Sequence, residues 1–284
     1  MKPDVKAFHD EPTGSIQYVV SDPVSARCAI IDPVLDFDRA CGRFTTNNAD
    51  AILDFVKARG LVIDWILDTH PHADHMSAAH YLHGRTGAPT AIGARVTQVQ
   101  RIWQERYDLP ELHTDGRQWT RLLGEADVLT VGALEVSVIN APGHTLATVI
   151  YRVGDAAFIN DTLFMPDSGT ARTDFPGGSA EDLWQTIGAI RSLPAETRLF
   201  TGHDYRPQGR PLAFESSLAE QQANIHLAGR DQQQFVNERQ ARDRTLPLPN
   251  LMLMALQVNL DGGRWPRADA AGRRFLKLPV EIGW

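Results

Sequence analysis

The sequence predicts a layered α/β protein in which two mixed β-sheets pack face to face with helices on the outside. Two observations predict it. Strand-like apolar runs gather in two halves of the chain, and each half continues into helical patterns. The chain of 284 residues is 43% hydrophobic, enough to bury a substantial core, and shows no internal repeat or linker. We therefore expect one domain over 1–284, with a helical C-terminal extension from about 214.

The first half begins with a hairpin and then alternates strands with helices. Residues 15–32 alternate in a strand-like way around a turn at Asp22-Pro23. Asp50 looks like the N-cap of a helix that ends at Gly60. The further elements expected are a buried strand over 61–69, a helix over about 76–82 that begins near Asp74, a strand over 90–92 and a helix over about 96–107.

In the second half the hydrophobic period drops to two. Gly132 and Gly154-Asp155 supply hairpin turns between strands. The elements expected in order are strands over 128–131, 134–139, 148–153 and 156–160, a helix over about 180–193, a strand over 198–201, helices over 214–227 and 232–244, and a mixed tail beyond Pro247. The last two helices are rich in Gln, Glu and Arg, which is typical of a solvated face or a subunit contact.

Charge and composition exclude several classes of function. The formal net charge of −7, without a dense Lys/Arg run, argues against nucleic-acid binding. No apolar run is long enough to span a membrane, and the first residues lack the apolar core of a signal peptide. Cys28 and Cys41 show no redox or metal spacing and are expected to be reduced. A cytoplasmic protein is the expectation.

The strongest functional signal is the segment Thr69–His75, which reads Thr-His-Pro-His-Ala-Asp-His. It contains His70, His72, Asp74 and His75 and directly follows a predicted buried strand. Three further candidate ligands also stand at the ends of predicted strands: His144, Asp161 and His203. Rigid strands that each deliver a ligand to one place are an efficient way to build a metal site.

The donor set consists of imidazole nitrogens and carboxylate oxygens. This set suits zinc, iron(II) or manganese and disfavours soft-metal and iron–sulfur sites. Two His and one Asp would form a facial triad for non-haem iron. All seven residues could instead hold two zinc ions bridged by Asp161 and a hydroxide, as in a hydrolase. Spacing alone leaves both alternatives open.

These motifs resemble the metallo-β-lactamase superfamily. The residues that carry the resemblance are Thr69–His75, Pro142-Gly143-His144-Thr145, Asp161-Thr162-Leu163-Phe164 and Gly202-His203-Asp204, and the match extends over roughly 15–210. The resemblance implies an αββα sandwich with a metal at the edge where loops of the two sheets converge.

Finer motifs are similar to the persulfide dioxygenases of the ethylmalonic-encephalopathy type and to bacterial β-lactamase-hydrolase-like proteins. They are Gly169-Thr170-Ala171-Arg172-Thr173-Asp174-Phe175, His203-Asp204-Tyr205, the segment 163–168 and Asn224-Ile225-His226. By this resemblance one Fe(II) per chain is held by His70, His144 and Asp161, and glutathione persulfide is oxidised with O₂. His72, Asp74, His75 and His203 would line the pocket that holds a second metal in related hydrolases.

Four polar residues are further candidates for roles at the site. Arg172 is expected either to orient Asp204 or bind a substrate carboxylate, or to be a surface residue. Tyr205 is expected either to donate a hydrogen bond to the thiol substrate or simply to pack. Asp74 and Asp204 are candidates for fixing imidazole tautomers, although Asp74 could equally be a helix N-cap.

The main alternative is a glyoxalase-II-type thioesterase with two Zn(II) ions and a metal-bound hydroxide. Asn160 argues against it, because related hydrolases usually carry Gly before the Asp. The expected partners are a small thiol persulfide and O₂, with a separate sulfurtransferase as a candidate supplier. We expect a homo-oligomer. The other five histidines are expected not to be ligands.

Overall fold

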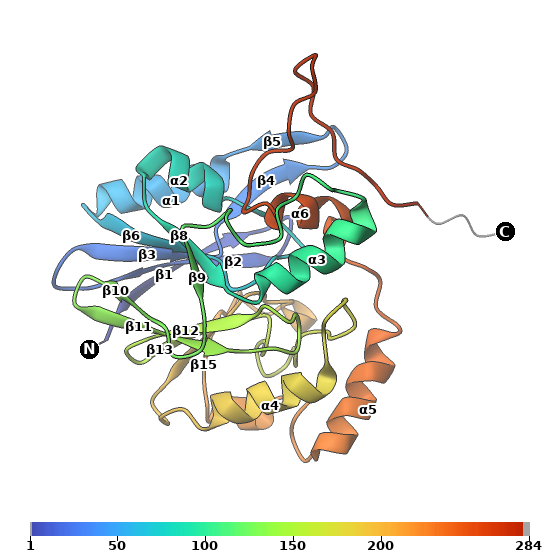
Figure 1. Cartoon of the computed structure of the whole chain (residues 1–284). Helices are drawn as coiled ribbons and strands as arrows, with labels where there is room; N and C mark the ends of the chain where they lie inside the picture. Colours follow the sequence, from blue (N-terminus) through green and yellow to red (C-terminus); the bar gives the residue numbers. More distant parts are fainter. Residues whose placement is uncertain (1, 281–284) are drawn as a thin grey trace.

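The computed structural model describes residues 2–280 and contains two six-stranded sheets packed face to face (Figure 1). The first sheet has the order β1-β2-β3-β6-β8-β9. Its strands are β1 (Asp4–Asp10), β2 (Ser15–Ser21), β3 (Arg27–Ile31), β6 (Val62–Leu67), β8 (Thr90–Gly93) and β9 (Arg121–Leu123). From β3 to β9 all neighbours are parallel, so their carboxyl ends lie at one edge.

The second sheet has the order β10-β11-β12-β13-β14-β15. Its strands are β10 (Val128–Val131), β11 (Leu134–Asn140), β12 (Val149–Val153), β13 (Ala156–Asn160), β14 (Arg198–Thr201) and β15 (Glu215–Ser217). The first four form an antiparallel meander, and β14 then runs parallel to β13. The carboxyl ends of β13 and β14 therefore lie side by side.

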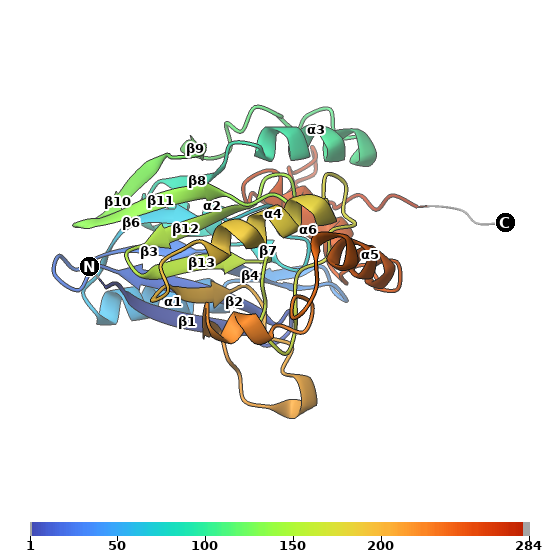
Figure 2. The same cartoon turned by 90° about the horizontal axis from the view of Figure 1, so that it is seen from below.

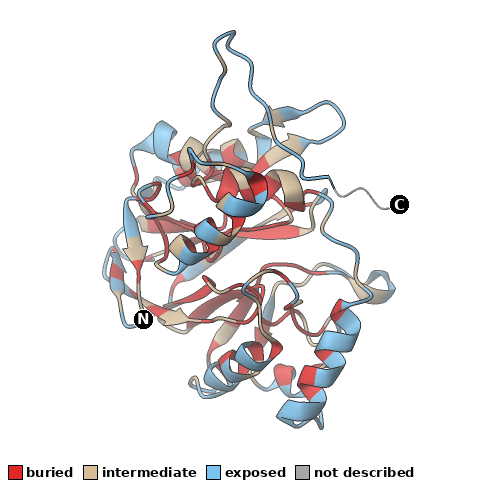
Figure 3. Cartoon of the chain, turned by 45° about the vertical axis from the view of Figure 1, so that its right-hand side comes forward, coloured by how far each residue is buried: buried red, intermediate tan, exposed pale blue. Residues whose placement is uncertain are grey.

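Helices cover the outer face of each sheet, so the expected αββα sandwich is confirmed (Figures 1 and 2). Helices α1 (Asn47–Ala58) and α2 (Ala79–Thr86) pack on the first sheet, and α4 (Ala180–Arg191) and α5 (Gln232–Asp243) pack on the second. Helices α3 (Val96–Tyr107) and α6 (Met252–Asn259) pack together in a further apolar cluster. The amphipathic helices keep their polar sides exposed, whereas the strands between them are buried (Figure 3).

The core between the sheets is built from the inward side chains of both. Tyr18 of β2 meets Phe158 of β13 and Phe200 of β14 edge to face, at ring-centroid distances of 5.2 and 5.5 Å. Burying each such ring stabilises the fold by about 1.5–3 kcal/mol. The Tyr18 hydroxyl donates to the carbonyl of Thr201, which satisfies it inside the core. This aromatic cluster holds the two sheets together, and Phe158 and Phe200 each stand three residues before a candidate ligand, Asp161 or His203.

The second half of the chain departs from the expectation in three places. The helix expected over 214–227 is wrong: β15 pairs antiparallel with β14 there, and only the short 3₁₀ turn η2 (Glu220–Ala223) follows. Pairing with β15 satisfies backbone groups that β14 would otherwise expose as an edge strand. A second 3₁₀ turn, η1 (Pro207–Gly209), and helix α6 were not expected.

The first half also contains corrections. Helix α1 begins at Asn47, so Asp50 lies in its first turn, where it accepts a hydrogen bond from the Thr46 hydroxyl. Residues expected to begin a helix at 76 form strand β7 (Met76–Ser77), which pairs with β4 (Val34–Asp38) in a small sheet completed by β5 (Arg43–Thr45). Since α2 starts only at Ala79, Asp74 is not its N-cap.

Candidate metal centre

The loop after β6 carries four of the seven candidate ligands into the edge between the sheets. His70, His72 and His75 are all buried. Burial lowers the pKa of His70 and His72 well below the ordinary value, so both are neutral at pH 7. Neutral imidazole is the form that binds a metal ion.

The second sheet contributes the other three ligands. His144 follows β11, Asp161 follows β13 and His203 follows β14. Glycines allow the approach: a Cβ on Gly202 would lie 2.7 Å from Oδ1 of Asp161, and one on Gly143 would lie 2.5 Å from Cα of Leu183. These loops therefore pack more closely than a larger residue would permit.

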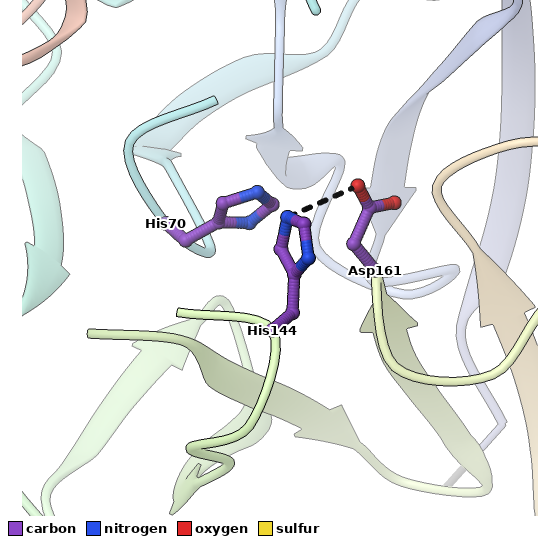
Figure 4. Close-up of side chains that lie close together, drawn as sticks. All are labelled: His70, His144 and Asp161. Carbon is purple, nitrogen blue, oxygen red and sulfur yellow. Dashed lines mark ion pairs between the residues drawn. The ribbon is translucent and has the colours of Figure 1, made fainter. Parts of the chain in front are cut away.

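His70, His144 and Asp161 point toward one another although they follow three different strands (Figure 4). Each offers a ligand atom, and these atoms all lie within 4.8 Å of one another. Nε2 of His144 is 3.6 Å from Oδ2 of Asp161. Nε2 of His70 and Oδ1 of Asp161 are buried without a hydrogen-bond partner among the described residues. Because buried polar atoms are nearly always satisfied, these orphaned atoms fit a metal ion.

Hydrogen bonds fix the imidazole rings of this triad. Nδ1 of His144 lies 2.8 Å from the backbone carbonyl of Arg172, so Nδ1 donates and Nε2 is free for a metal. Nδ1 of His70 donates to the Thr69 hydroxyl, 3.1 Å away, and that hydroxyl in turn donates to Asp32. Both rings are thus held with Nε2 toward the centre.

Asp74 and His203 form a second group beside the triad. Oδ2 of Asp74 is 2.7 Å from Nδ1 of His75 and 3.3 Å from Nε2 of His203, and it accepts a hydrogen bond from the Ser15 hydroxyl. Burial alone would lower the pKa of His203, but the carboxylates of Asp161 and Asp74 outweigh it and raise that pKa to about 10. In the absence of a metal, this group is therefore a hydrogen-bonded cluster around a protonated imidazole.

Asp32, which the sequence motifs do not single out, forms hydrogen bonds with the loop that carries the histidines. Its carboxylate accepts hydrogen bonds from the backbone and hydroxyl of Thr69, from Nε2 of His72 and from the side chain of Asn160. Asn160 has a φ of +36°, a conformation that favours glycine. Its bond to Asp32 is a structural reason for an asparagine at this position. The sequence contains an indication of Asp32, because this residue directly follows an apolar strand, as Asp161 does.

Arg172 does not orient Asp204, which was one of its two expected roles. Its guanidinium pairs with Asp174 at 2.7 and 2.8 Å and donates to the carbonyl of Pro247. Asp204 instead pairs with Arg210 at 2.7 Å, so it does not fix an imidazole tautomer either. Asp174 is therefore the residue that anchors the Arg172 side chain.

A cavity of about 550 Å³ opens beside the triad. The residues that line it include His144, Asp161 and His203, together with Arg172, Tyr205 and the segment 246–251. Tyr205 is 64% exposed and its ring stacks on that of His203. The cavity is large enough for a small-molecule substrate. Direct contact of Arg172 or Tyr205 with a substrate stays a prediction.

The remaining histidines do not join the triad. Nδ1 of His83 bonds to the carbonyl of Ala88, and His226 accepts a hydrogen bond from the backbone of Thr170. The two cysteines are unbridged, with Cys28 buried and Cys41 exposed. Within residues 2–280 no helix combines the length and apolarity needed to cross a membrane.

Asp68 gives a pH-dependent prediction. Burial raises its pKa from 3.8 to about 7, although it accepts hydrogen bonds from Ser77 and Trp119. The folded state therefore holds a proton that the unfolded state releases, and stability is lost as pH rises from 3.8 to about 7. We expect the metal-free Asp68→Asn variant to gain stability relative to wild type across this range, as measured by urea unfolding in a buffer series. If the unfolding free energies of the two proteins changed in parallel with pH, a raised pKa of Asp68 would be contradicted.

Known proteins resemble this chain over nearly its whole length. The family profile described as the metallo-beta-lactamase superfamily matches residues 14–203. A beta-lactamase hydrolase-like protein of Xylella fastidiosa (strain Temecula1) is 61% identical over 98% of this chain, which spans 65% of that protein's length. Glyoxylase B2 of Dictyostelium discoideum is 39% identical, covering 98% of this chain and 97% of that protein. The crystal structure of ETHE1 from Myxococcus xanthus aligns with a TM-score of 0.74 and 27% identity, covering 92% of this chain and 100% of that one.

Proposed function

Because the chain belongs to the metallo-beta-lactamase superfamily, we propose that it is a persulfide dioxygenase that binds one Fe(II). The substrate is glutathione persulfide, which is oxidised by O₂ to sulfite and glutathione. The balanced reaction consumes one persulfide, one O₂ and one water and releases one glutathione, one sulfite and two protons. As the chain spans 65% of its beta-lactamase hydrolase-like relative, this proposal concerns the chain and not that longer protein.

The observation that carries the proposal is the arrangement of the triad: the ligand atoms of His70, His144 and Asp161 converge, and hydrogen bonds leave Nε2 of both histidines facing the centre. Nε2 of His70 and Oδ1 of Asp161 are buried without hydrogen-bond partners among the described residues, and in the second pocket the same holds for Nδ1 of His72 and Nε2 of His75. Asp74 and His203 are instead bonded to each other and to protein groups. A second ion would have to replace these contacts.

The sequence motifs and the comparisons support the same branch. The segment Gly169–Phe175 resembles the ethylmalonic-encephalopathy-type dioxygenases, and the aligned ETHE1 structure is covered along its full length. A triad of two His and one Asp leaves open positions, as non-haem iron oxygenases require.

The chain's own residues prepare the site for this reaction. Bound iron would supply the electron chemistry that activates O₂. The carbonyl of Arg172 holds His144 with Nε2 inward, and Phe164 and Phe175 provide apolar wall that limits water. Tyr205 stands at the wall with its ring against His203, where its hydroxyl could donate to a thiol substrate. A homo-oligomer and a separate sulfurtransferase as persulfide source stay predictions.

A glyoxalase-II-type hydrolase with two Zn(II) ions is the second candidate. It is favoured by the presence of all seven ligands at one edge and by the similarity to Glyoxylase B2 over nearly its whole length. In that case the seven ligands would hold two zinc ions, which would supply the activation of water for hydrolysis of a glutathione thioester.

Turnover measurements separate the two functions. We expect the purified protein to consume O₂ with glutathione persulfide and to form sulfite in equal amount. S-Lactoylglutathione should be hydrolysed slowly or not at all under the same conditions. Rapid hydrolysis of that thioester without O₂ uptake, in a protein inactive on the persulfide, would reverse the assignment.

A further inference from the structure

The last residue of helix α6, Asn259, is buried against the loop that carries the histidines. Its side-chain NH₂ donates to the carbonyls of His72 and His75, at 2.8 and 2.7 Å. Its side-chain oxygen accepts from the backbone N–H of Ser77, at 2.7 Å. One amide therefore holds three backbone groups of the loop, although 182 or more residues separate them in sequence.

Helix α6 is itself firmly placed. Gln100 of α3 donates to the carbonyl of Leu260, directly after α6, at 2.8 Å. Gly263, with a φ of +79°, lies so close to the loop that a Cβ there would be 2.7 Å from the carbonyl oxygen of Ser77. Met252 and Leu256 of α6 pack with Val99 and Trp103 of α3 in a buried cluster. The Asn259 amide is thus presented by a rigid element.

We propose that Asn259 is a positioning residue of the metal centre, through which α6 sets the backbone of the His72–Ser77 loop. The bonds fix the carbonyls of His72 and His75 and thereby the backbone path of the loop that begins at His70. They therefore set where the triad ligand His70 projects, as well as the side chains of the second pocket. The helix lies outside the segment 14–203 that the family profile matches, so this contribution is additional to the family's motifs. The inference rests on the proposed metal centre but not on which reaction occurs there.

The test uses Asn259→Asp with Gln257→Glu as matched control. The aspartate keeps the size and the acceptor but loses both donors and places charge against two carbonyls. Gln257, on the same helix, also makes three hydrogen bonds to backbone groups, those of Leu253 and Lys277, away from the metal loop. Both variants exchange an amide for a carboxylate.

Three measurements are made on the full chain: affinity for Co(II), the visible spectrum of the Co(II) form, and amide hydrogen exchange over 72–77 in the metal-free protein. Loss of a supporting partner typically weakens metal binding about 10- to 100-fold. We expect Asn259→Asp to fall in this range, to shift the Co(II) bands and to speed exchange in the loop, whereas Gln257→Glu stays within about twofold of wild type.

Asn259→Ser provides a milder variant in case the aspartate does not fold, because its hydroxyl is too short to reach all three groups. Its Co(II) affinity should be below that of wild type. Wild-type affinity and an unchanged Co(II) spectrum in a folded Asn259 variant would overturn the proposal, and so would an equal loss of affinity in Gln257→Glu. Because Co(II) binding is read without turnover, these outcomes are independent of whether the enzyme is a dioxygenase or a hydrolase.

Discussion

Replacing His144 or Asp161 with alanine is expected to abolish iron binding and to lower O₂ uptake by more than about 100-fold, the upper end of the cost of losing an outer-shell partner. Each residue contributes one of only three converging ligand atoms in the triad. The His144 side chain makes one protein hydrogen bond, to the Arg172 carbonyl, which leaves Nε2 for the metal. Iron content and O₂ consumption of the purified variants measure the effect.

His72→Ala is the comparison that makes this result informative. Nε2 of His72 is bonded to Asp32, and we place His72 in the second pocket rather than in the triad. The variant should therefore keep much of its iron. If His72→Ala loses iron as completely as His144→Ala, the single-metal assignment is wrong.

The second large effect is expected on stability. Asp243→Ala should lower the free energy of unfolding by about 3–5 kcal/mol, because it leaves a buried arginine without its counter-ion. Asp243 pairs with Arg239, and both side chains are only 2% exposed. Asp243 also accepts hydrogen bonds from the backbone and hydroxyl of Thr173. Urea or thermal unfolding of the metal-free protein measures the loss.

A matched control lies on the same helix. Glu238 of α5 pairs with Arg230 at 3.2 Å, but this pair is largely exposed. Glu238→Ala should change stability by no more than about 1 kcal/mol. Because Thr173 adjoins Arg172, whose carbonyl orients His144, Asp243→Ala should also weaken metal binding. Equal stability losses in the two variants would show that burial does not set the cost.

The strands of the second sheet were predictable because each is a short alternating or apolar run bounded by turn residues. Strand β10 alternates exposed and buried residues, whereas β13 is buried on both faces. The expected strands over 128–131, 156–160 and 198–201 have the bounds found in the structure. The same holds for helix α3, whose apolar stripe packs against α6. Local pattern and tertiary environment agree in these segments.

Other elements depend on partners that the local sequence does not reveal. Residues 215–217 form a strand because β14 offers an open edge, not because of their own pattern. Residues 76–77 pair with β4, which delays the start of α2. Helix α6 is apolar on most sides, so its sequence shows little helical periodicity, although it contacts the metal loop through Asn259.

The candidate site was predictable in its ligands but not in their supports. His70, His144 and Asp161 follow strands whose ends meet at one edge, so their convergence follows from topology. Asp32, Asn259 and the Arg172 carbonyl act through hydrogen bonds to residues distant in sequence, which leave no periodic signal. The sequence likewise does not indicate that Asp204 pairs with Arg210 rather than with Arg172.

Metal analysis of the purified protein tests the central claim most directly. The protein should be produced with both iron and zinc available and analysed by elemental mass spectrometry alongside His144→Ala. We predict about one iron per chain in wild type and almost none in the variant. Two zinc ions per chain, with little iron, would contradict the dioxygenase assignment and favour the hydrolase.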